Sequence, residues 1–84
     1  MNCRVLYFAR LRERFELAEE SLEFAGTPSV ADLITHLQAR GGVWSEELGD
    51  GKSFRVAVNQ ALVQTDVPIP DDAEVAIFPP VTGG

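Results

Sequence analysis

The chain has few of the residues that form covalent cross-links or membrane spans. Its 84 residues include one cysteine, Cys3, so an internal disulfide is excluded and a secreted disulfide-rich scaffold is not expected. No apolar run approaches the roughly eighteen residues that a membrane-spanning helix requires. Arginines at positions 4, 10, 12 and 14 interrupt the opening segment, so a signal peptide is not expected either. The expected location is the cytoplasm.

Positive charge is also scarce. Seven Lys and Arg stand against 13 Asp and Glu, which gives a formal net charge of −6. Nucleic acid is therefore not expected as a partner, because phosphate backbones are bound by clustered Lys and Arg. Protein partners with basic surfaces fit this charge better, since complementary charge speeds encounter. The hydrophobic content of 45% is nevertheless sufficient for one folded domain with a modest core.

The first half of the chain predicts a hairpin followed by the main helix. The segment 3–9, CRVLYFA, is apolar on both alternating sets of residues, which is typical of a central strand. A turn or two of helix is expected over 10–16 and a second strand over 21–24. In SVADLITHL, Ser29 is a good N-cap and Asp32 gives a near capping box, while a glycine pair at 41–42 ends the helix. Its apolar face consists of Val30, Leu33, Ile34 and Leu37.

The second half predicts three more strands. Residues 43–53 are expected to be irregular, with one helical turn over 44–48. The segment 54–59 alternates cleanly, Asn59 and Gln60 form a turn into a short strand over 61–63, and the last strand covers 74–78. This order favours one sheet packed on one main helix, with the first and last strands able to pair in parallel. The predicted fold class is α+β, a β-grasp (ubiquitin-like) mixed sheet over 1–78 with an extended C-terminal tail over 79–84.

The last seven residues, FPPVTGG, are poorly suited to extending a sheet. Pro79 and Pro80 lack backbone N–H groups and favour extended polyproline geometry, which points the following residues away from the domain. The six residues from Pro79 reach about 20 Å when extended. Gly83 and Gly84 have no side chains and could thread a narrow channel. The tail therefore predicts a carboxylate at Gly84 that is presented to a partner, whereas the alternative is a frayed end.

The stretch VNQALV…DDAEVAIFPPVTGG, together with VLYFA and SVADLITHL, resembles the prokaryotic sulfur carriers of the ubiquitin-like MoaD/ThiS family. It is most similar to the small subunits of molybdopterin synthase, and the resemblance covers nearly the whole chain. A terminal Gly-Gly alone is a weak signal, but the Phe-Pro-Pro approach to it is specific. The chain departs from the family at Asp72, where a glycine often precedes the last strand. Because Asp tolerates left-handed torsions, this departure concerns only the local turn.

The resemblance implies that Gly84 is the reactive residue. An adenylating enzyme related to ubiquitin-activating enzymes would use ATP to convert its carboxylate to an acyl-adenylate. Sulfur that derives from a cysteine desulfurase would then replace AMP and leave a thiocarboxylate. In the large subunit of molybdopterin synthase, this sulfur would attack precursor Z (cyclic pyranopterin monophosphate) to form molybdopterin. The residues expected to thread into that subunit are Pro79, Pro80, Val81, Thr82 and Gly83.

The resemblance also implies an assembly. The family suggests a heterotetramer of two small and two large subunits, with no permanently bound cofactor and no catalytic acid or base in this chain. Interface residues are implied at Phe8, Leu62 and Phe78, and strand alternation allows Phe8 and Phe78 to share one side of the sheet. The alternative is that these three side chains belong to the core, because strand parity does not reveal which side the helix covers.

Three other features have simpler explanations than a site. Cys3 could carry sulfur as a persulfide, but a lone cysteine in a strand is usually an inert core residue. His36 lies off the apolar face of its helix and has no partners at metal-ligand spacing, so we expect it to face solvent and expect no metal. Asp71, Asp72 and Glu74 look like a carboxylate site, but turn chemistry explains them better.

Several functions are compatible with the same residues. The leading hypothesis is a sulfur carrier in molybdenum cofactor biosynthesis. A carrier could instead serve another sulfur pathway, such as thiamine, cysteine or tRNA thiolation. The chain could also be a ubiquitin-like modifier whose Gly84 forms isopeptide bonds with lysines, or an interaction module with an incidental tail.

Overall fold

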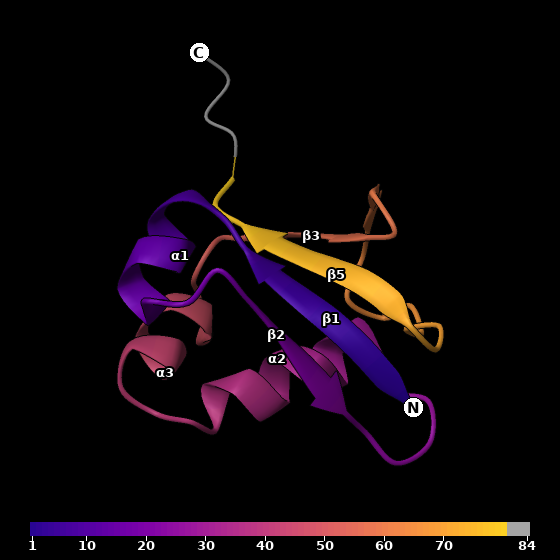
Figure 1. Cartoon of the computed structure of the whole chain (residues 1–84). Helices are drawn as coiled ribbons and strands as arrows, with labels where there is room; N and C mark the ends of the chain where they lie inside the picture. Colours follow the sequence, from indigo (N-terminus) through magenta and orange to yellow (C-terminus); the bar gives the residue numbers. More distant parts are fainter. Residues whose placement is uncertain (81–84) are drawn as a thin grey trace.

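A computed structural model describes residues 1–80 (Figure 1). Five strands form one mixed sheet in the order β2-β1-β5-β3-β4. At its centre β1 and β5 pair in parallel, while the other neighbouring strands pair antiparallel. This arrangement is the predicted β-grasp fold. The elements are β1 (Asn2–Tyr7), α1 (Ala9–Phe15), β2 (Glu19–Glu23), α2 (Val30–Gln38), α3 (Val43–Leu48), β3 (Arg55–Val58), β4 (Ala61–Val63) and β5 (Ala73–Phe78).

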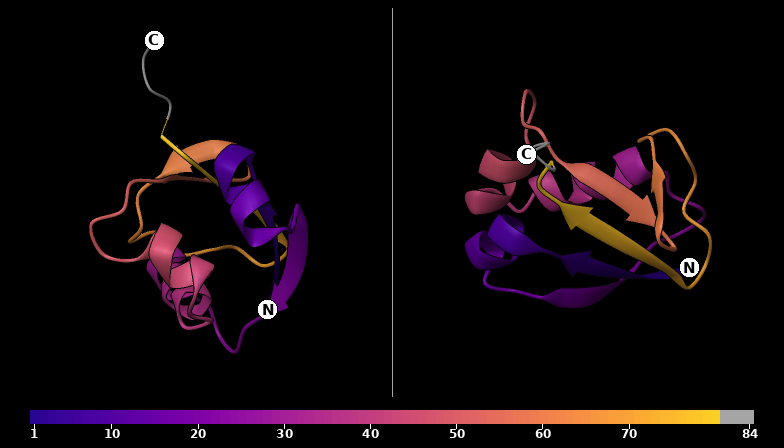
Figure 2. Two further views of the ribbon diagram at one scale, coloured as in Figure 1. Left: turned by 90° about the vertical axis from the view of Figure 1, so that its left-hand side faces the viewer. Right: turned by 90° about the horizontal axis from the view of Figure 1, so that it is seen from above.

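The core lies between the sheet and a layer of helices that covers one side of it (Figure 2). Alternate residues of the two central strands are buried against α2, whose apolar face enters the same cluster. This burial shows which side of β1 the helices cover. The alternate residues that include Val5 face the helices, and those that include Leu6 and Phe8 face away from them. No helix within residues 1–80 is long and apolar enough to cross a membrane. The buried residues of the central strands are Cys3, Val5, Tyr7, Ala73, Val75 and Ile77.

The main helix begins where the sequence predicts, and it ends at Gln38, shortly before the glycine pair that was expected to stop it. The Ser29 hydroxyl accepts a hydrogen bond from the Asp32 N–H at 3.1 Å, and the Asp32 carboxylate accepts one from the Ser29 N–H at 2.9 Å. This reciprocal pair is a complete capping box, which satisfies two N–H groups that the first helical turn would otherwise leave unpaired. At the other end, Gly41 and Gly42 adopt positive φ values of 75° and 55°, which glycine reaches without steric cost.

Most element boundaries differ from the predictions by one residue, and three differences have a clear physical meaning. The first strand ends at Tyr7 rather than at residue 9, because the Phe8 carbonyl accepts hydrogen bonds that start α1. The second strand begins at Glu19, two positions before the predicted start at 21, and these polar residues are tolerated because β2 is an edge strand. The expected turn over 44–48 is a short helix, α3.

A charged network fastens the edge strand β2 to the helix layer. The Tyr7 hydroxyl donates to Glu20 Oε2 at 2.6 Å, and the Arg40 guanidinium donates to both oxygens of the same carboxylate at 2.8 Å. Arg40 also lies 4.5 Å from the centre of the Trp44 ring. The hydrogen bond from Arg40, aided by the one from Tyr7, holds the pKa of Glu20 below its ordinary value despite partial burial.

The capping box predicts the effect of Ser29→Ala. We expect this change to lower the free energy of unfolding by about 1 kcal/mol, because Asp32 loses the acceptor for its N–H group. Urea denaturation measures the loss. Thr35→Ala on the exposed side of the same helix is the control and should not destabilise the domain. An S29A variant as stable as the unsubstituted chain would contradict the assigned cap.

The depressed pKa of Glu20 predicts a change in acid stability. A carboxylate whose pKa is lower in the folded state than in the unfolded state stabilises the fold at any pH above its ordinary pKa of about 4.3. This stabilisation is lost as the pH falls below that ordinary pKa and through the lower pKa of the folded state. Glu20→Gln should therefore cost about 1 to 2 kcal/mol at pH 7, and the difference should shrink toward pH 3. Urea unfolding at both pH values checks this. The exposed Glu23→Gln on the same strand is the control, and an equal loss at both pH values would argue against the assignment.

Candidate functional site

The side of the sheet that faces away from α2 carries an apolar row across four strands. The register pairs Leu6 of β1 with Ala76 of β5, Ala76 with Ala57 of β3, and Ala57 with Leu62 of β4. Residues paired across neighbouring strands project to the same side of a sheet. These four side chains therefore form one continuous row on the uncovered side.

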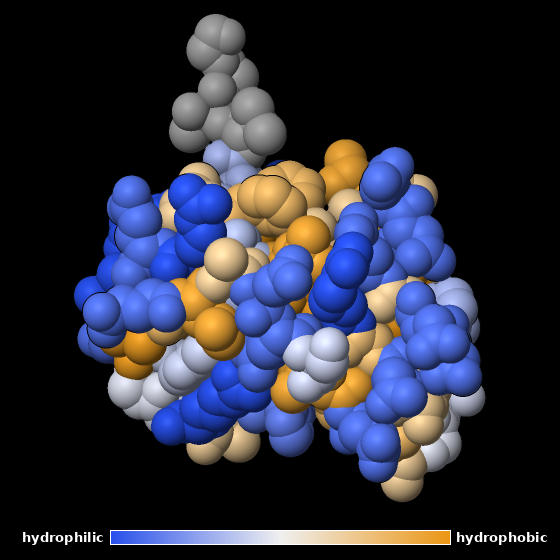
Figure 3. Space-filling view, viewed as in Figure 1, coloured by the Kyte–Doolittle hydropathy of each residue, from blue (hydrophilic) through white to orange (hydrophobic). Residues whose placement is uncertain are grey.

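Two aromatic residues lie beside this row, at the end of the sheet where β5 finishes. Phe8 follows Tyr7, which is paired with Ile77, and its N–H donates to the Ile77 carbonyl at 3.2 Å, so Phe8 lies next to Phe78. We call this surface the apolar face (Figure 3). It consists of Leu6, Phe8, Ala57, Leu62, Ala76 and Phe78.

The predicted docking residues all lie on the apolar face. Phe8 is 43% exposed and Leu62 is 69% exposed, and they are the large hydrophobic residues that stand out on the surface of residues 1–80. Phe78 is half-buried and lies next to Phe8. The core alternative is therefore wrong for Phe8 and Leu62. Exposed apolar side chains gathered on one side of a small domain are typical of a surface that binds another protein.

Backbone hydrogen bonds fix the position of Phe8. Its backbone is extended, with φ −126° and ψ 155°, and its carbonyl accepts hydrogen bonds from the N–H groups of Leu11 and Arg12 at 3.1 and 3.4 Å. The next residue, Ala9, has a positive φ of 52°, which turns the chain into α1. Phe8 is thus the N-cap of a helix as well as the continuation of a strand, and its ring is held on the apolar face.

A tight hairpin fixes the position of Leu62. Asn59 and Gln60 have positive φ values of 49° and 71°, which are typical of a two-residue type I′ loop. Asn59 also joins this loop to β5, because its N–H donates to the Glu74 carbonyl at 2.8 Å and its side chain accepts from the Glu74 N–H at 3.0 Å. The short strand β4 is therefore held in register, with Leu62 opposite Ala57.

The base of the tail lies directly beyond the apolar face. The last strand ends at Phe78, and Pro79 and Pro80 follow it half-buried. They border a hollow of about 280 Å³. The other residues that line it are Arg10, Leu11, Glu47, Lys52 and Ser53. The remaining predicted tail residues, Val81, Thr82, Gly83 and Gly84, lie outside the described residues.

Sequence reasoning did not assign several residues of this region to a site, among them Ala57, Arg55 and Lys52. Ala57 completes the apolar row, and Arg55 lies opposite Phe78 at its rim. Both could have been found from the alternation of segment 54–59, which places them on the side opposite Val56. Lys52 borders the tail base from the loop between α3 and β3, and no pattern in the sequence brings that loop to Pro79.

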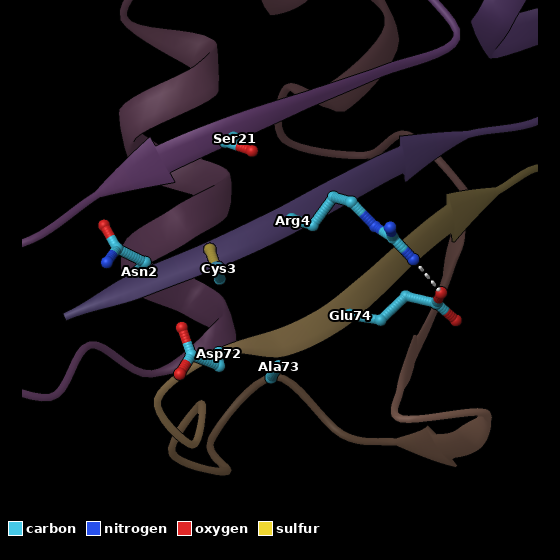
Figure 4. Close-up of a pocket in the computed structure, with 7 residues that line it drawn as sticks. All are labelled: Asn2, Cys3, Arg4, Ser21, Asp72, Ala73 and Glu74. Carbon is cyan, nitrogen blue, oxygen red and sulfur yellow. Dashed lines mark hydrogen bonds and ion pairs between the residues drawn. The ribbon is translucent and has the colours of Figure 1, made fainter.

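The acidic residues at the opposite end of the sheet have structural roles. A hollow of about 310 Å³ lies there, and Arg4 and Glu74 on its lining form an ion pair of 2.7 Å. Figure 4 shows the side chains of these lining residues. The Asp71 carboxylate accepts the Asn2 N–H at 2.8 Å, and the Asp72 N–H donates to the Asn2 carbonyl at 2.7 Å. Asp72 has φ 60°, so it takes the left-handed conformation expected for the residue that replaces the family's glycine. Turn chemistry explains these carboxylates, as predicted.

Two further predictions concern Cys3 and His36. Cys3 is 2% exposed, and burial raises the pKa of its thiol, so the reactive thiolate is disfavoured. His36 is exposed, as expected, and its ring packs edge-to-face on Phe24 with 5.2 Å between ring centres. Neither residue adjoins the apolar face or the tail base.

Comparison with known proteins gives near-full-length matches. The chain is 45% identical over 83 residues to a molybdopterin synthase sulfur carrier subunit of Escherichia coli, covering 96% of this chain and 98% of the relative. It is 39% identical over 82 residues to the protein of the same name in Haemophilus influenzae, and the match covers 95% of this chain and 96% of that relative. Among solved structures, a Pyrococcus furiosus chain described as molybdopterin converting factor subunit 1 superposes with a TM-score of 0.83 at 31% sequence identity. The superposition covers 96% of this chain and 99% of that one.

The family comparison agrees with these relatives. The matched segment begins in β1 and includes the Gly-Gly end, so it contains both the apolar face and the tail. The model described as the ThiS family matches residues 5–84, and the chain therefore belongs to the ThiS family.

Proposed function

We propose that this protein is the sulfur carrier subunit of a molybdopterin synthase in molybdenum cofactor biosynthesis. The observation that carries the proposal is its near-full-length likeness to proteins of that name, which extends to 45% identity. The chain also ends in Gly-Gly, and the strand that leads into this tail borders an exposed apolar face. The docking surface and the base of the tail that carries Gly84 thus lie at the same end of the domain.

In this proposal the chemistry takes place at Gly84. An adenylating enzyme joins the Gly84 carboxylate to AMP, with loss of pyrophosphate from ATP. The terminal sulfur of a persulfide, produced by a cysteine desulfurase, displaces AMP and forms an acyl disulfide at Gly84. A thiol then attacks the other sulfur of this disulfide, is oxidised to a new disulfide, and leaves a C-terminal thiocarboxylate. In the large subunit this sulfur attacks precursor Z, and hydrolysis of the acyl link returns the carboxylate. Two such cycles supply the two sulfurs of the molybdopterin dithiolene.

Physical chemistry supports a protein-bound donor of this kind. A thiocarboxylate is ionised at neutral pH and its sulfur is a soft nucleophile, as in a thiolate. Holding the sulfur on a protein that docks raises its effective concentration at the acceptor and avoids free sulfide. The two glycines at the end of the tail present no side chain to the walls of a narrow channel.

The apolar face is the part of this protein that we propose binds the large subunit. Phe8 and Phe78 supply aromatic anchors beside the tail base, and Leu62 extends the surface to β4. Buried aromatic and aliphatic anchors usually contribute most of the binding free energy at an interface. The assembly is then a heterotetramer of two small and two large subunits.

Intact mass tests the proposed chemistry. After incubation with the cognate adenylating enzyme, ATP and a persulfide donor, we expect a species about 16 Da heavier, because one oxygen of the Gly84 carboxylate is replaced by sulfur. Adding precursor Z and the large subunit should restore the original mass and form molybdopterin. Conjugates with lysines of other proteins would favour a modifier instead, and an unchanged mass would contradict the proposal.

Two tail variants are matched controls for this experiment. Deletion of Gly84, or addition of one residue after it, should abolish the heavier species, because the activated carboxylate is lost or displaced. Both should leave the urea midpoint nearly unchanged, since terminal residues seldom contribute to stability. Sulfur loading of the deletion variant would place the chemistry elsewhere.

Leu62→Asp tests the docking surface. A charge within the apolar contact should weaken binding to the large subunit by about 2 kcal/mol or more, which is about thirtyfold in Kd. Because Leu62 is 69% exposed, the fold should survive the substitution. Ala31→Asp makes the same change in charge at an exposed position on α2, on the other side of the molecule. Titration calorimetry should show normal affinity for A31D, and an equal loss in both variants would remove Leu62 from the interface.

A further inference from the structure

Leu62 is the most exposed residue of the apolar face, and the strand that carries it is short. β4 has three residues and is the last strand of the sheet, with β3 as its neighbour. A two-stranded hairpin on its own is at best marginally stable in water. The position of Leu62 therefore depends on contacts that come from outside the hairpin.

Two tethers hold the hairpin, one on each side of β4 along the chain. After the strand, the Thr65 carbonyl accepts a hydrogen bond from the Ala31 N–H of α2 at 2.8 Å. Before the strand, in the loop that follows β3, Asn59 is bonded to Glu74 of β5. Leu62 lies between these two tethers, so the loss of either one frees one end of its strand.

The Asn59 side chain extends the pairing of β3 with β5 by one step. The last pair of the register joins Val58 to Val75, and the next position would join Asn59 to Glu74. In a hydrogen-bonded antiparallel pair, the two residues exchange N–H···O=C bonds through their backbones. Here the Asn59 N–H donates to the Glu74 carbonyl at 2.8 Å, but the Glu74 N–H donates to the Asn59 side-chain oxygen at 3.0 Å. The side-chain amide thus takes the place of the backbone carbonyl of its own residue.

The turn explains why a side chain is needed at this position. Asn59 has φ 49° and Gln60 has φ 71°, so the chain has left the extended conformation at Asn59 and is turning into β4. Asparagine tolerates this left-handed conformation better than most residues, and it carries an acceptor as well. Glycine would meet the first requirement but not the second, whereas aspartate would meet both. Substitution can therefore separate the two requirements.

We propose that Asn59 is a positioning residue for docking, because its side chain holds Leu62 in place in the apolar face before a partner binds. This inference rests on the proposed function, since it requires the large subunit to dock on that face. The hydrogen bond from Glu74 fixes the loop at the start of β4, and the register then places Leu62 opposite Ala57. A side chain that is already ordered loses less conformational entropy on binding, which strengthens the complex.

A merely structural role for Asn59 makes a different prediction. If the side chain only stabilised the fold, a folded variant without it would bind the partner as well as the unsubstituted chain does. The pairing of β3 with β5 has four residue pairs of its own, and these do not include Asn59. We therefore expect the loss of this side chain to affect the hairpin and the contact made by Leu62, while the rest of the sheet stays intact.

Asn59→Gly removes the acceptor and keeps the torsion. We expect N59G to weaken binding to the large subunit about fivefold in Kd by titration calorimetry, because the freed strand has to be ordered on binding. Asn59→Asp restores an acceptor and should bind within about twofold of the unsubstituted chain. Gln60→Gly is the matched control, since it introduces glycine at the neighbouring exposed loop residue, which also has a positive φ, and it should bind normally. Urea unfolding checks that every variant is folded under the assay conditions.

A double-mutant cycle shows whether Asn59 acts through Leu62. Because Leu62→Ala removes the side chain that Asn59 positions, adding N59G to this variant should weaken binding by less than about twofold. Equal losses from N59G in both backgrounds, normal binding by N59G, or binding by N59D as weak as that of N59G would each overturn the inference.

Amide hydrogen exchange reports on the hairpin without a partner. The N–H groups of Ala61 and Val63, which lie in the pairing of β4 with β3, should exchange at least about tenfold faster in N59G than in Q60G. Exchange in β1 should be the same in both variants. Unchanged exchange in β4 would overturn the positioning role even if the affinity of N59G falls.

The same titrations separate this inference from the proposed function. If the unsubstituted chain binds the large subunit and N59G binds equally well, the role of Asn59 alone is overturned. If the unsubstituted chain does not bind the large subunit, the proposed function fails, and the docking role of Asn59 fails with it whatever the exchange rates show.

Discussion

The parallel pairing of β1 with β5 is the constraint on which the rest of the structure depends. It joins the two ends of the chain at the centre of one sheet, with Val5 opposite Val75 and Tyr7 opposite Ile77. Because the strands run the same way, the start of β1 lies far from the end of β5, and Phe8 is carried to Phe78. The same pairing therefore builds the core, assembles the aromatic part of the apolar face and sets the place from which the tail leaves.

The two sides of a sheet that helices cover on one side only carry different kinds of side chain. The side toward α2 is filled by branched and aromatic residues, whereas the other combines the apolar face with the Arg4–Glu74 pair at the far end. A small domain gains little from leaving Phe8 and Leu62 in water, since burial of each would be worth about 1.5 to 3 kcal/mol. Their exposure is understandable if a partner covers them, and the proposed large subunit supplies that cover beside the tail.

Most elements could be predicted from the sequence because local signals specify them. The capping box of Ser29 and Asp32 fixes one end of α2, and positive φ at Asn59 and Gln60 fits the predicted hairpin. The alternation of side chains along each strand correctly predicted which residues share a side of the sheet. It could not predict which side the helices cover, because the residues on both sides of β1 are apolar. The start of β2 at Glu19 was missed because long-range contacts rather than local propensity hold this acidic segment in a strand: Glu20 is bound by Tyr7 and Arg40, and Glu19 pairs with Leu6. The position of Lys52 depends on a loop that only the tertiary structure brings to the tail.

The choice of basic residues fits the proposed role of the C-terminus as an acyl donor. The ion pairs that hold the surface together use arginine, as in Arg4 with Glu74 and Arg40 with Glu20. Arginine keeps the charge and the paired hydrogen bonds that lysine would supply in part, and it offers no free amine for acylation. A lysine at any of these positions would add a nucleophile to a molecule that, in the proposed function, keeps its activated carboxylate for sulfur. On this reasoning the scarcity of lysine, with Lys52 the single one in the sequence, limits wasteful acylation of amines on the carrier itself.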